Sequence, residues 1–470
     1  MKFAIFRAQL RTVFRLPALL AALVFLTLWS GLMLGGVPAS LNATSTFHSL
    51  GANDPGDQYA AQLARRYGAR LTPSTREGLS NELESEKRHF ADDLAELPAA
   101  VAAGVTDWES YQAYLNQAQR SEEGMAVSGY DDEGGDVYRG PVLQAINVGA
   151  YSSRVRVEYL TRLVNPLAMY TGADVGASDT EVIEAVKTGA LSTLLMTREQ
   201  PLIGGQSSGS VTWNEQDSSE NGNETTSASL PPTMVERVDV LFAQFDTEDC
   251  QFGYLPEQAR NAAVNTVVAL LVGLPIVAMI VIVPVRTRDR RYGIVALQFA
   301  SRVGRGIVWP QTLALLAAAS LVSLAAGLMV LLPMLWVFRD FLAFPMLDAT
   351  RIFDAGSMLW FDTNLAWFLV LACLLSVLFA VACAMLAAWL VRFVDSLIPM
   401  LLRVVPFAAV CVLVGMFGMG IDVFRLDALL NRWVPMPGCE YLACAAALIV
   451  ASVLWCVTGI RSRTRELVAR

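Results

Sequence analysis

The chain has 470 residues, of which 54% are hydrophobic and 17% are charged. Soluble domains carry about 25% charged residues, so this composition excludes a disordered chain and disfavours a soluble globular protein. The formal net charge of −8 argues against nucleic acid as the main partner. Charge is unevenly spread, because residues 37–260 hold 33 acidic and 15 basic residues while the rest holds 10 and 20.

The N-terminus combines a basic face with an apolar segment. Residues 1–15 place four basic side chains at helical spacing among phenylalanines, which predicts an amphipathic helix in the membrane interface. Residues 16–37 then form an apolar run of about 22 residues, long enough to span a bilayer. The alternative is a cleaved signal peptide, whose core is usually about 7–15 residues, so we favour a retained first span.

Residues 38–260 form a polar block that predicts a mainly α-helical domain. Apolar residues three to four apart, or helix start signals, predict helices in five segments: 57–70, 75–97, 106–114, 141–170 and 179–199. Residues 121–140 are rich in glycine and acidic residues and predict a loop. Its acidic residues at 131–136 miss the spacing of a calcium loop, so we expect no metal site there. Residues 204–232 are of low complexity and are expected to be mobile.

Residues 261–470 contain five further uncharged intervals of spanning length. Their limits are the flanking charged residues: 261–285, 306–338, 363–391, 404–421 and 441–460. Residues 421–440 are too apolar for a free loop and predict short re-entrant helices. The predicted fold class is therefore an all-α integral membrane protein, with six transmembrane helices and a mainly α-helical extracytoplasmic domain.

Basic residues give the orientation. With the N-terminus in the cytoplasm, the inside segments carry 16 Lys and Arg residues and the short outside loops carry four. This asymmetry follows the positive-inside rule. It predicts a multi-pass protein of the plasma membrane with both termini in the cytoplasm and the polar block outside.

Motifs for chemistry are missing from the sequence. It contains no HExxH, CxxC or GxSxG motif and no GxxxxGK[ST] loop, so we expect neither an enzyme nor a nucleotide-hydrolysing site in this chain. The cores of the predicted spans contain no Asp, Glu, His or Lys, and Arg403 lies at the inner end of the fifth. Since such residues mark proton pathways, a proton-coupled carrier is disfavoured.

Three stretches resemble the permease subunits of ABC-2-type transporters. The most specific is DRRYGIVALQFASRVGRGIVWPQ, residues 289–311, which is similar to the segment that follows the family's second span. Residues 426–440 resemble the outer helices before its last span, and residues 59–115 resemble the outer domains of bacterial members. The order of elements matches along the whole chain, whereas the outer domain beyond about residue 140 matches nothing in the family.

The resemblance implies an ATP-driven permease whose ATPase is a separate subunit. ATP and magnesium would be held by that ATPase, and this chain would need no cofactor. Residues 286–306 would form the coupling segment. Its candidate contact residues are Arg290, Arg291, Tyr292, Gly293, Leu297, Phe299 and Arg302. The alternative is that the arginines of this segment contact lipid headgroups.

Further expectations concern partners and cargo. The resemblance implies a second permease, identical or different, in a shared lipid environment. The second and fifth spans would line the pathway, as in the family. Because the spans hold few polar residues, the pathway would be mostly apolar, which favours a lipid-like or amphipathic peptide substrate. The alternative is that these apolar faces are ordinary surface in contact with membrane lipid. A membrane receptor or export-apparatus scaffold that binds through its outer domain is the competing function.

The seven cysteines divide into two groups. Five lie in predicted spans, where they are expected to act as small packing residues. Cys250 and Cys439 lie outside the predicted spans on the side where disulfides persist. They either form a bridge that fastens the outer domain to the bundle or remain two free thiols, because a sequence does not fix the distance between their Cα atoms.

Overall fold

We describe the chain from a computed structural model. The structure describes residues 7, 10, 11, 13–35, 57–120, 128–130, 136–138, 141–165, 179–199, 230–244, 247–292, 308–349, 358–392, 394, 396–420 and 422–468. It divides into two compact units, each described below by itself. We call Met1–Pro38, Asn261–Leu342 and Leu365–Arg470 the bundle, and Ala39–Arg260 with Ala343–Asn364 the inserted unit.

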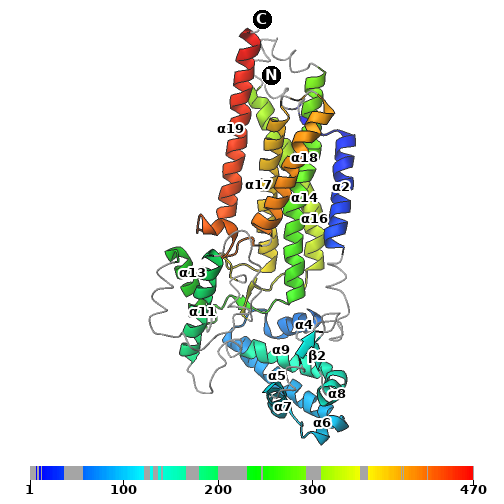
Figure 1. Ribbon diagram of the computed structural model, residues 1–470, viewed down its shortest axis with the longest axis vertical. Coiled ribbons are helices and arrows are strands. Elements are labelled where there is room, and N and C mark those ends of the chain that lie inside the picture. The colour runs from blue at the N-terminus through cyan, green and yellow to red at the C-terminus, as the bar shows by residue number, and fades with distance from the viewer. Residues whose placement is uncertain are drawn as a thin grey trace. The chain divides into compact units, whose positions relative to one another are not determined.

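Six helices of the bundle are long and apolar enough to cross a membrane. They are α2 (Leu16–Leu34), α14 (Glu257–Arg291), α16 (Val308–Val337), α17 (Leu365–Leu390), α18 (Leu397–Leu413) and α19 (Cys439–Val468) (Figure 1). A π-helical segment, η7 (Val414–Gly420), extends α18. The prediction of six apolar spans in a mostly helical, multi-pass membrane protein is thereby confirmed.

The fifth span begins earlier than the sequence predicts. It starts at Leu397, and Arg403 therefore lies inside the helix rather than before it. The Arg403 side chain is exposed and donates a hydrogen bond to the Leu390 carbonyl at 3.2 Å. A charge so close to the end of a span can reach the interface along its own stem, so it does not end the helix.

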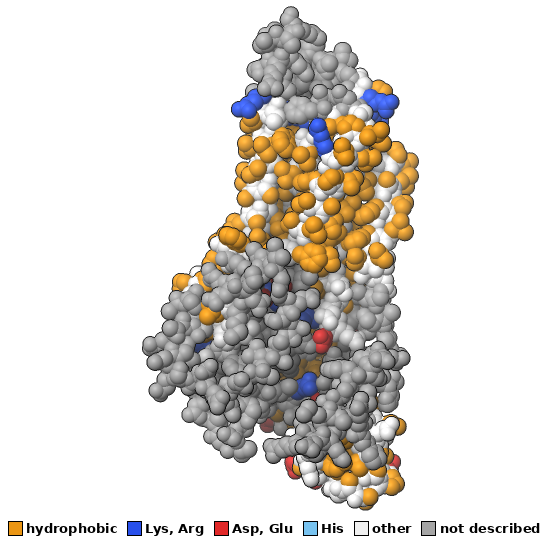
Figure 2. Space-filling view, viewed as in Figure 1, with side chains coloured by type: hydrophobic (Ala, Val, Ile, Leu, Met, Phe, Trp, Pro, Cys, Tyr) orange, Lys and Arg blue, Asp and Glu red, His pale blue; other side chains and the backbone are white. Residues whose placement is uncertain are grey.

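Helix α17 is the centre of the bundle and packs against both α16 and α19. Alanines at 380, 384, 387 and 388 are fully buried and allow close approach of the neighbouring helices. In contrast, α2, α18 and α19 expose most of their apolar length. Figure 2 accordingly shows hydrophobic side chains covering the surface of the bundle helices, as expected for a surface in contact with lipid.

The inserted unit is mainly α-helical. Its helices are α4 (Asp57–Tyr67), α5 (Pro73–Ala95), α6 (Pro98–Ala102), α7 (Trp108–Arg120), α8 (Pro141–Gly149), α9 (Tyr151–Val164), α11 (Asp179–Glu199) and α13 (Pro232–Ala243). The first helix ends at Tyr67, three residues before its predicted end, because Gly68 takes a φ of +100°, which does not continue a helix. The core forms where α5 packs on α9, and Phe90 is buried there beside Trp108 and Tyr111.

Two predictions for loops need correction. Residues 121–140, expected to be a loop, contain an antiparallel ribbon of β1 (Ser128–Tyr130) and β2 (Asp136–Tyr138). Residues 421–440, expected to hold short re-entrant helices, have turns and a single 3₁₀ turn, η8 (Leu429–Arg432), in their described part. Most of the predicted mobile segment 204–232 and most of the N-terminal amphipathic helix lie outside the described residues.

The connection between the third and fourth spans belongs to the inserted unit, which the sequence did not indicate. Strand β4 (Leu347–Asp348) of this connection pairs in parallel with β3 (Phe252–Gly253). Arg260 forms an ion pair with Asp348, whose side chain is only 4% exposed. Arg237 pairs with Asp362 and donates to the Leu359 carbonyl at 3.1 Å. These contacts make residues 343–364 an integral part of the unit.

Close packing at this junction requires a glycine. A Cβ atom on Gly253 would lie 2.7 Å from the ring of Pro345 and 2.8 Å from the Ala69 carbonyl oxygen. Both distances are shorter than real Cβ contacts, so only glycine allows the three segments to meet. The ring of Tyr254 then packs edge-on against Phe344, with their centroids 5.4 Å apart.

The Arg260–Asp348 ion pair should be a main source of stability in the inserted unit. Arg260→Ala removes the guanidinium from a buried carboxylate, which typically costs about 3–5 kcal/mol. We expect the melting temperature of the purified protein in detergent to fall by on the order of 10 °C. Arg66→Ala is the matched control, because its ion pair with Glu82 leaves Arg66 64% exposed and should change little. Equal effects of the two substitutions would contradict this assignment.

Candidate functional site

The seam between α14 and α18 is the first candidate site, because the second and fifth spans are expected to line the pathway. At one end it is closed by an apolar cluster of buried residues: Met279, Val283, Ala387, Val391, Val394 and Met400. The Thr287 hydroxyl, 8% exposed, donates to the Met400 sulfur at 3.0 Å and joins the two helices. This end of the seam is therefore closed by close-packed side chains.

The other end of the seam is closed by backbone contact. A Cβ on Gly415 would lie 3.0 Å from the Leu271 carbonyl oxygen of α14, and one on Gly420 would lie 3.0 Å from Val268. Both glycines belong to η7, and π-helical turns within α-helices are frequent at functional sites. Glycine thus lets the π-helical segment approach α14 more closely than any other residue would.

Hydroxyl groups in the bundle contribute little polarity. Thr266 and Ser376 are fully buried, and each donates to a carbonyl oxygen four residues earlier in its own helix, at 2.8 and 2.7 Å. Such internal bonds satisfy the hydroxyl within its own helix. The sequence-based expectation of a mostly apolar seam agrees with these contacts.

Two arginines, one in the last turns of α14 and one just after α17, contact one tryptophan in the middle of α19. The guanidinium carbons of Arg286 and Arg392 lie 4.9 and 4.7 Å from the centroid of the Trp455 ring, within cation–π distance. Arg392 also donates to the Trp455 carbonyl at 2.6 Å and to the Thr458 hydroxyl at 3.1 Å. We call Arg286, Arg392 and Trp455 the arginine clamp, and it ties the last turns of α14 to two other spans.

Helix α14 leads from the clamp into the predicted coupling segment. It ends at Arg291, and both Arg291 and the following Tyr292 are exposed, Tyr292 by 68%. Arg290 lies in the same last turn. The other residues of this prediction, Gly293, Leu297, Phe299 and Arg302, lie outside the described residues, so their grouping on one surface stays a prediction.

Glu440 is a buried carboxylate that sequence reasoning treated only as a boundary. It lies in the first turn of α19, is 1% exposed and accepts a hydrogen bond from the Phe424 backbone N–H at 3.0 Å. Its second oxygen is buried and has no hydrogen-bond partner among the described residues. Phe424 has a φ of +61°, which non-glycine residues seldom adopt, so the carboxylate fixes a strained turn.

Cys250 and Cys439 form no disulfide in the structure, and both are buried. The Cys439 thiol donates to the Asn431 side-chain oxygen at 3.1 Å, and the Cys250 sulfur lies 4.0 Å from the Phe252 carbonyl oxygen. Each thiol therefore has a neighbour within its own unit. The bridge that the sequence left open is not formed here. The five cysteines of the spans are also free, and four of them are buried as expected for packing residues.

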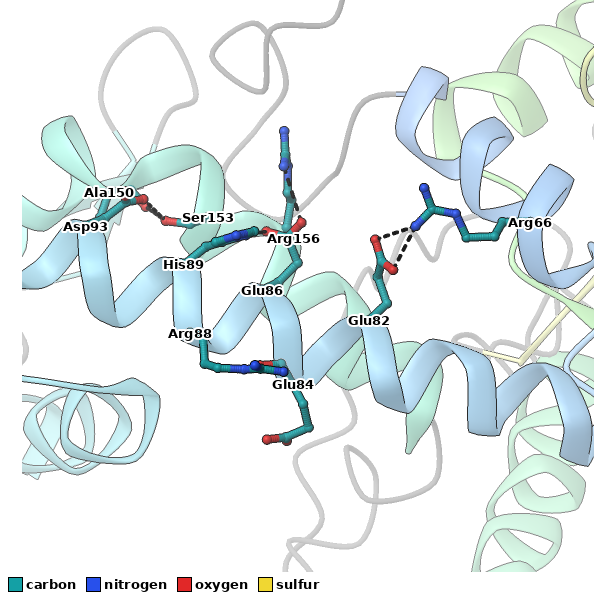
Figure 3. Close-up of polar contacts among 10 residues, drawn as sticks. All are labelled: Arg66, Glu82, Glu84, Glu86, Arg88, His89, Asp93, Ala150, Ser153 and Arg156. Atoms are coloured by element: carbon teal, nitrogen blue, oxygen red, sulfur yellow. Dashed lines mark hydrogen bonds and ion pairs between the residues drawn. The ribbon is translucent and has the colours of Figure 1, made fainter.

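A polar network joins three helices of the inserted unit (Figure 3). Asp93 of α5 accepts a hydrogen bond from Ser153 of α9, and Glu86 of α5 pairs with Arg156 of α9 at 3.3 Å. Glu82 of α5 pairs with Arg66 of α4 at 3.0 Å. Because each contact joins two helices, we assign the network a packing role.

Tyr59 shows the electrostatic effect of this network. Burial raises the pKa of the Tyr59 phenol well above its usual value, and the nearby carboxylates Glu86 and Glu82 raise it further. The guanidinium of Arg156 lies 5.2 Å from the centroid of the Tyr59 ring. The phenol is therefore neutral at physiological pH, and the cation contacts its ring.

Within the part of the chain that the structure describes, no cluster of His, Cys, Asp and Glu could hold a metal ion.

Comparison of the chain with protein-family models, with curated proteins and with solved structures finds no match.

Substitutions in η7 test the close contact with α14. Gly420→Ala places a Cβ 2.6 Å from the Gly415 carbonyl oxygen and 3.0 Å from Val268, so the segment must shift. Overpacking of this kind costs about 1–3 kcal/mol, and we expect a lower melting temperature in detergent. Gly418→Ala is the matched control, since its Cβ meets only a Val414 methyl at 3.6 Å. A larger loss of stability at Gly418 would rule out the close contact.

Proposed function

We propose that this chain is the permease subunit of an ATP-driven transporter of the ABC-2 type, powered by a separate ATPase. The supporting observation is the path of α14. The helix begins in the inserted unit at Glu257, continues as the second span, passes the arginine clamp and ends at Arg291, directly before the predicted coupling segment. One helix therefore connects that segment mechanically to the spans.

The arginine clamp would transmit a movement of α14 to other helices of the bundle. Because Arg286 and Arg392 share the ring of Trp455, a force on the end of α14 acts on α17 and α19 as well. A docking partner at residues 286–306 would thus move several helices together. The seam between α14 and α18, closed by the apolar cluster and the glycines of η7, is the element that such movement would open.

The proposed orientation places the inserted unit outside the cell and both termini in the cytoplasm. The distribution of 16 against four basic residues supports it. The fold supports the order of the six crossings, because the connection after the first span and the connection after the third span belong to one compact unit. Two connections separated by two crossings lie on the same side of a membrane, as the six-span arrangement requires.

The cargo we propose is lipid-like or an amphipathic peptide. The support is the apolar cluster that closes the seam, together with Thr266 of α14, whose hydroxyl is satisfied within its own helix. A second permease chain, identical or different, would complete the pathway. If the competing function as a receptor or scaffold holds instead, no ATPase will accompany the chain.

Purification from native membranes tests the coupling. We expect an ABC ATPase to co-purify with the tagged chain, and Leu297→Asp with Phe299→Asp to abolish this, because two charges on the predicted apolar faces would prevent docking. Membrane insertion of this variant should be unchanged. Retention of the ATPase by the variant, or its absence from the wild type, would reject the proposal.

Cysteine labelling tests the orientation. Val101→Cys lies on an exposed position of α6, 52% exposed, and Tyr292→Cys follows α14 at a position that is 68% exposed. In intact cells a membrane-impermeant maleimide should label the first and reach the second only after permeabilisation. The wild-type chain, whose described cysteines are mostly buried, gives the background. Labelling of both positions in intact cells would contradict the proposed topology.

A further inference from the structure

An apolar groove of about 340 Å³ lies between α2 and α16. Its most buried lining residues are Leu26 and Leu34 from α2 and Val330 and Met334 from α16. The rims are formed by exposed residues of both helices, among them Gly31 and Pro333. Figure 1 shows α2 at the edge of the bundle, beside α16. The groove is therefore open to the surroundings of the bundle.

The groove between α2 and α16 stays open because α2 is held by a contact with α14. The Trp29 indole donates to the Ala269 carbonyl oxygen at 3.0 Å, and its ring fills the space in front of Gly273, where a Cβ would lie 2.8 Å from it. This contact fixes the position of α2 beside α14. On the side of α2 that faces the groove, Gly31 has no side chain, and a Cβ built there meets nothing within 4 Å.

The lining offers no useful partner to water. Thr27 donates to the Val24 carbonyl at 3.0 Å and Ser30 to the Leu26 carbonyl at 2.6 Å, so both hydroxyls are satisfied within α2. The remaining lining side chains are apolar. A stably bound water needs two to four polar partners, whereas a hydrocarbon chain needs none. Between two spans the available hydrocarbon is the acyl chain of a lipid.

Polar side chains mark one end of the groove. Trp336 follows Met329 and Pro333 at intervals of seven and three residues, which places it on the same face of α16. It is 71% exposed, and the guanidinium carbon of Arg339 lies 5.3 Å from the centroid of its ring. Tryptophan and arginine at the end of a span are typical of the headgroup region.

Arg339 can receive a phosphate. Its side chain is 61% exposed, and its Nε lies 3.7 Å from an Asp340 carboxylate oxygen, beyond the length of a hydrogen bond. Such an exposed pair is weak and gives way readily. The planar guanidinium matches a phosphate with two parallel hydrogen bonds. The negative charge of the adjacent Asp340 disfavours a headgroup with a net negative charge and so favours a zwitterionic one.

We propose that this groove is a binding site for a zwitterionic glycerophospholipid, with one acyl chain between α2 and α16 and the phosphate on Arg339. The site is distinct from the seam between α14 and α18, and the proposal does not rest on the transport function. It predicts selective occupancy, in contrast to the exposed apolar face of α18, which any membrane lipid can touch.

Photo-crosslinking tests the site on the full chain in vesicles of phosphatidylcholine that contain a trace of phosphatidylethanolamine with a diazirine in its acyl chain. Labelled peptides are mapped by mass spectrometry. We expect several-fold more label on Leu26–Gly35 and Met329–Met334 than on Leu397–Val405 of α18. Equal labelling of these segments would show ordinary lipid contact and overturn the proposal.

Filling the groove gives the decisive comparison. Gly31→Phe, whose Cβ would meet nothing within 4 Å, places a ring in the groove and should reduce the groove label to the level of α18. Leu28→Phe adds a ring at a position of α2 that is 70% exposed and not part of the lining, so it should leave the label unchanged. Met329→Trp fills the groove from the other helix if the first variant does not fold. Undiminished labelling in a folded filling variant would reject the site.

Arg339→Gln tests the phosphate contact. We expect several-fold less label from the phosphatidylethanolamine probe, and unchanged label from diacylglycerol that carries the same diazirine chain. A loss with both probes would assign Arg339 a structural role, and no loss with either would remove the phosphate from the proposal.

Discussion

Within the hydrocarbon of a bilayer a peptide group finds no water, so each N–H and C=O left unpaired costs several kcal/mol. This constraint accounts for the six helices and for the behaviour of the polar residues within them. The hydroxyls of Thr266 and Ser376 bond to carbonyls of their own helices. Where the helical pattern changes, in η7, glycines bring the backbone against α14, which shields it from lipid. Charged side chains lie at helix ends, as Arg286 and Glu440 do near the end of α14 and the start of α19.

The elements that depend on this constraint were readable from the sequence. Uncharged intervals of spanning length located all six helices, because a charge seldom lies within the hydrocarbon. The error at the fifth span has the same physical basis, since Arg403 is near enough to the end of α18 to reach the interface. Helical periodicity likewise located most helices of the inserted unit.

Features that depend on contacts between distant segments were not readable. The pairing of β3 with β4 involves two residues in each strand, too few to leave a pattern. Residues 343–364 looked like an ordinary loop because their role rests on Arg260 and Arg237, which lie about a hundred residues away along the chain. Of the candidate site, the sequence indicated the coupling segment and the apolar seam, whereas the clamp on Trp455 and the burial of Glu440 required coordinates. Arg392 and Trp455 are 63 residues apart, and neither lies in a motif.

The entry of residues 343–364 into the inserted unit has a consequence for biosynthesis. Arg260 is translated 88 residues before its partner Asp348, and a hairpin of two membrane spans, α14 and α16, is made between them. The unit therefore reaches its final form only after the third span has entered the membrane and the chain has crossed back. During synthesis β3 and Arg260 are made before β4 and Asp348, with which they pair in the folded unit. Nascent chains are open to misfolding and proteolysis at contacts that form late in this way. Expression of the unit alone, cut at Arg260, would leave it without its closing segment.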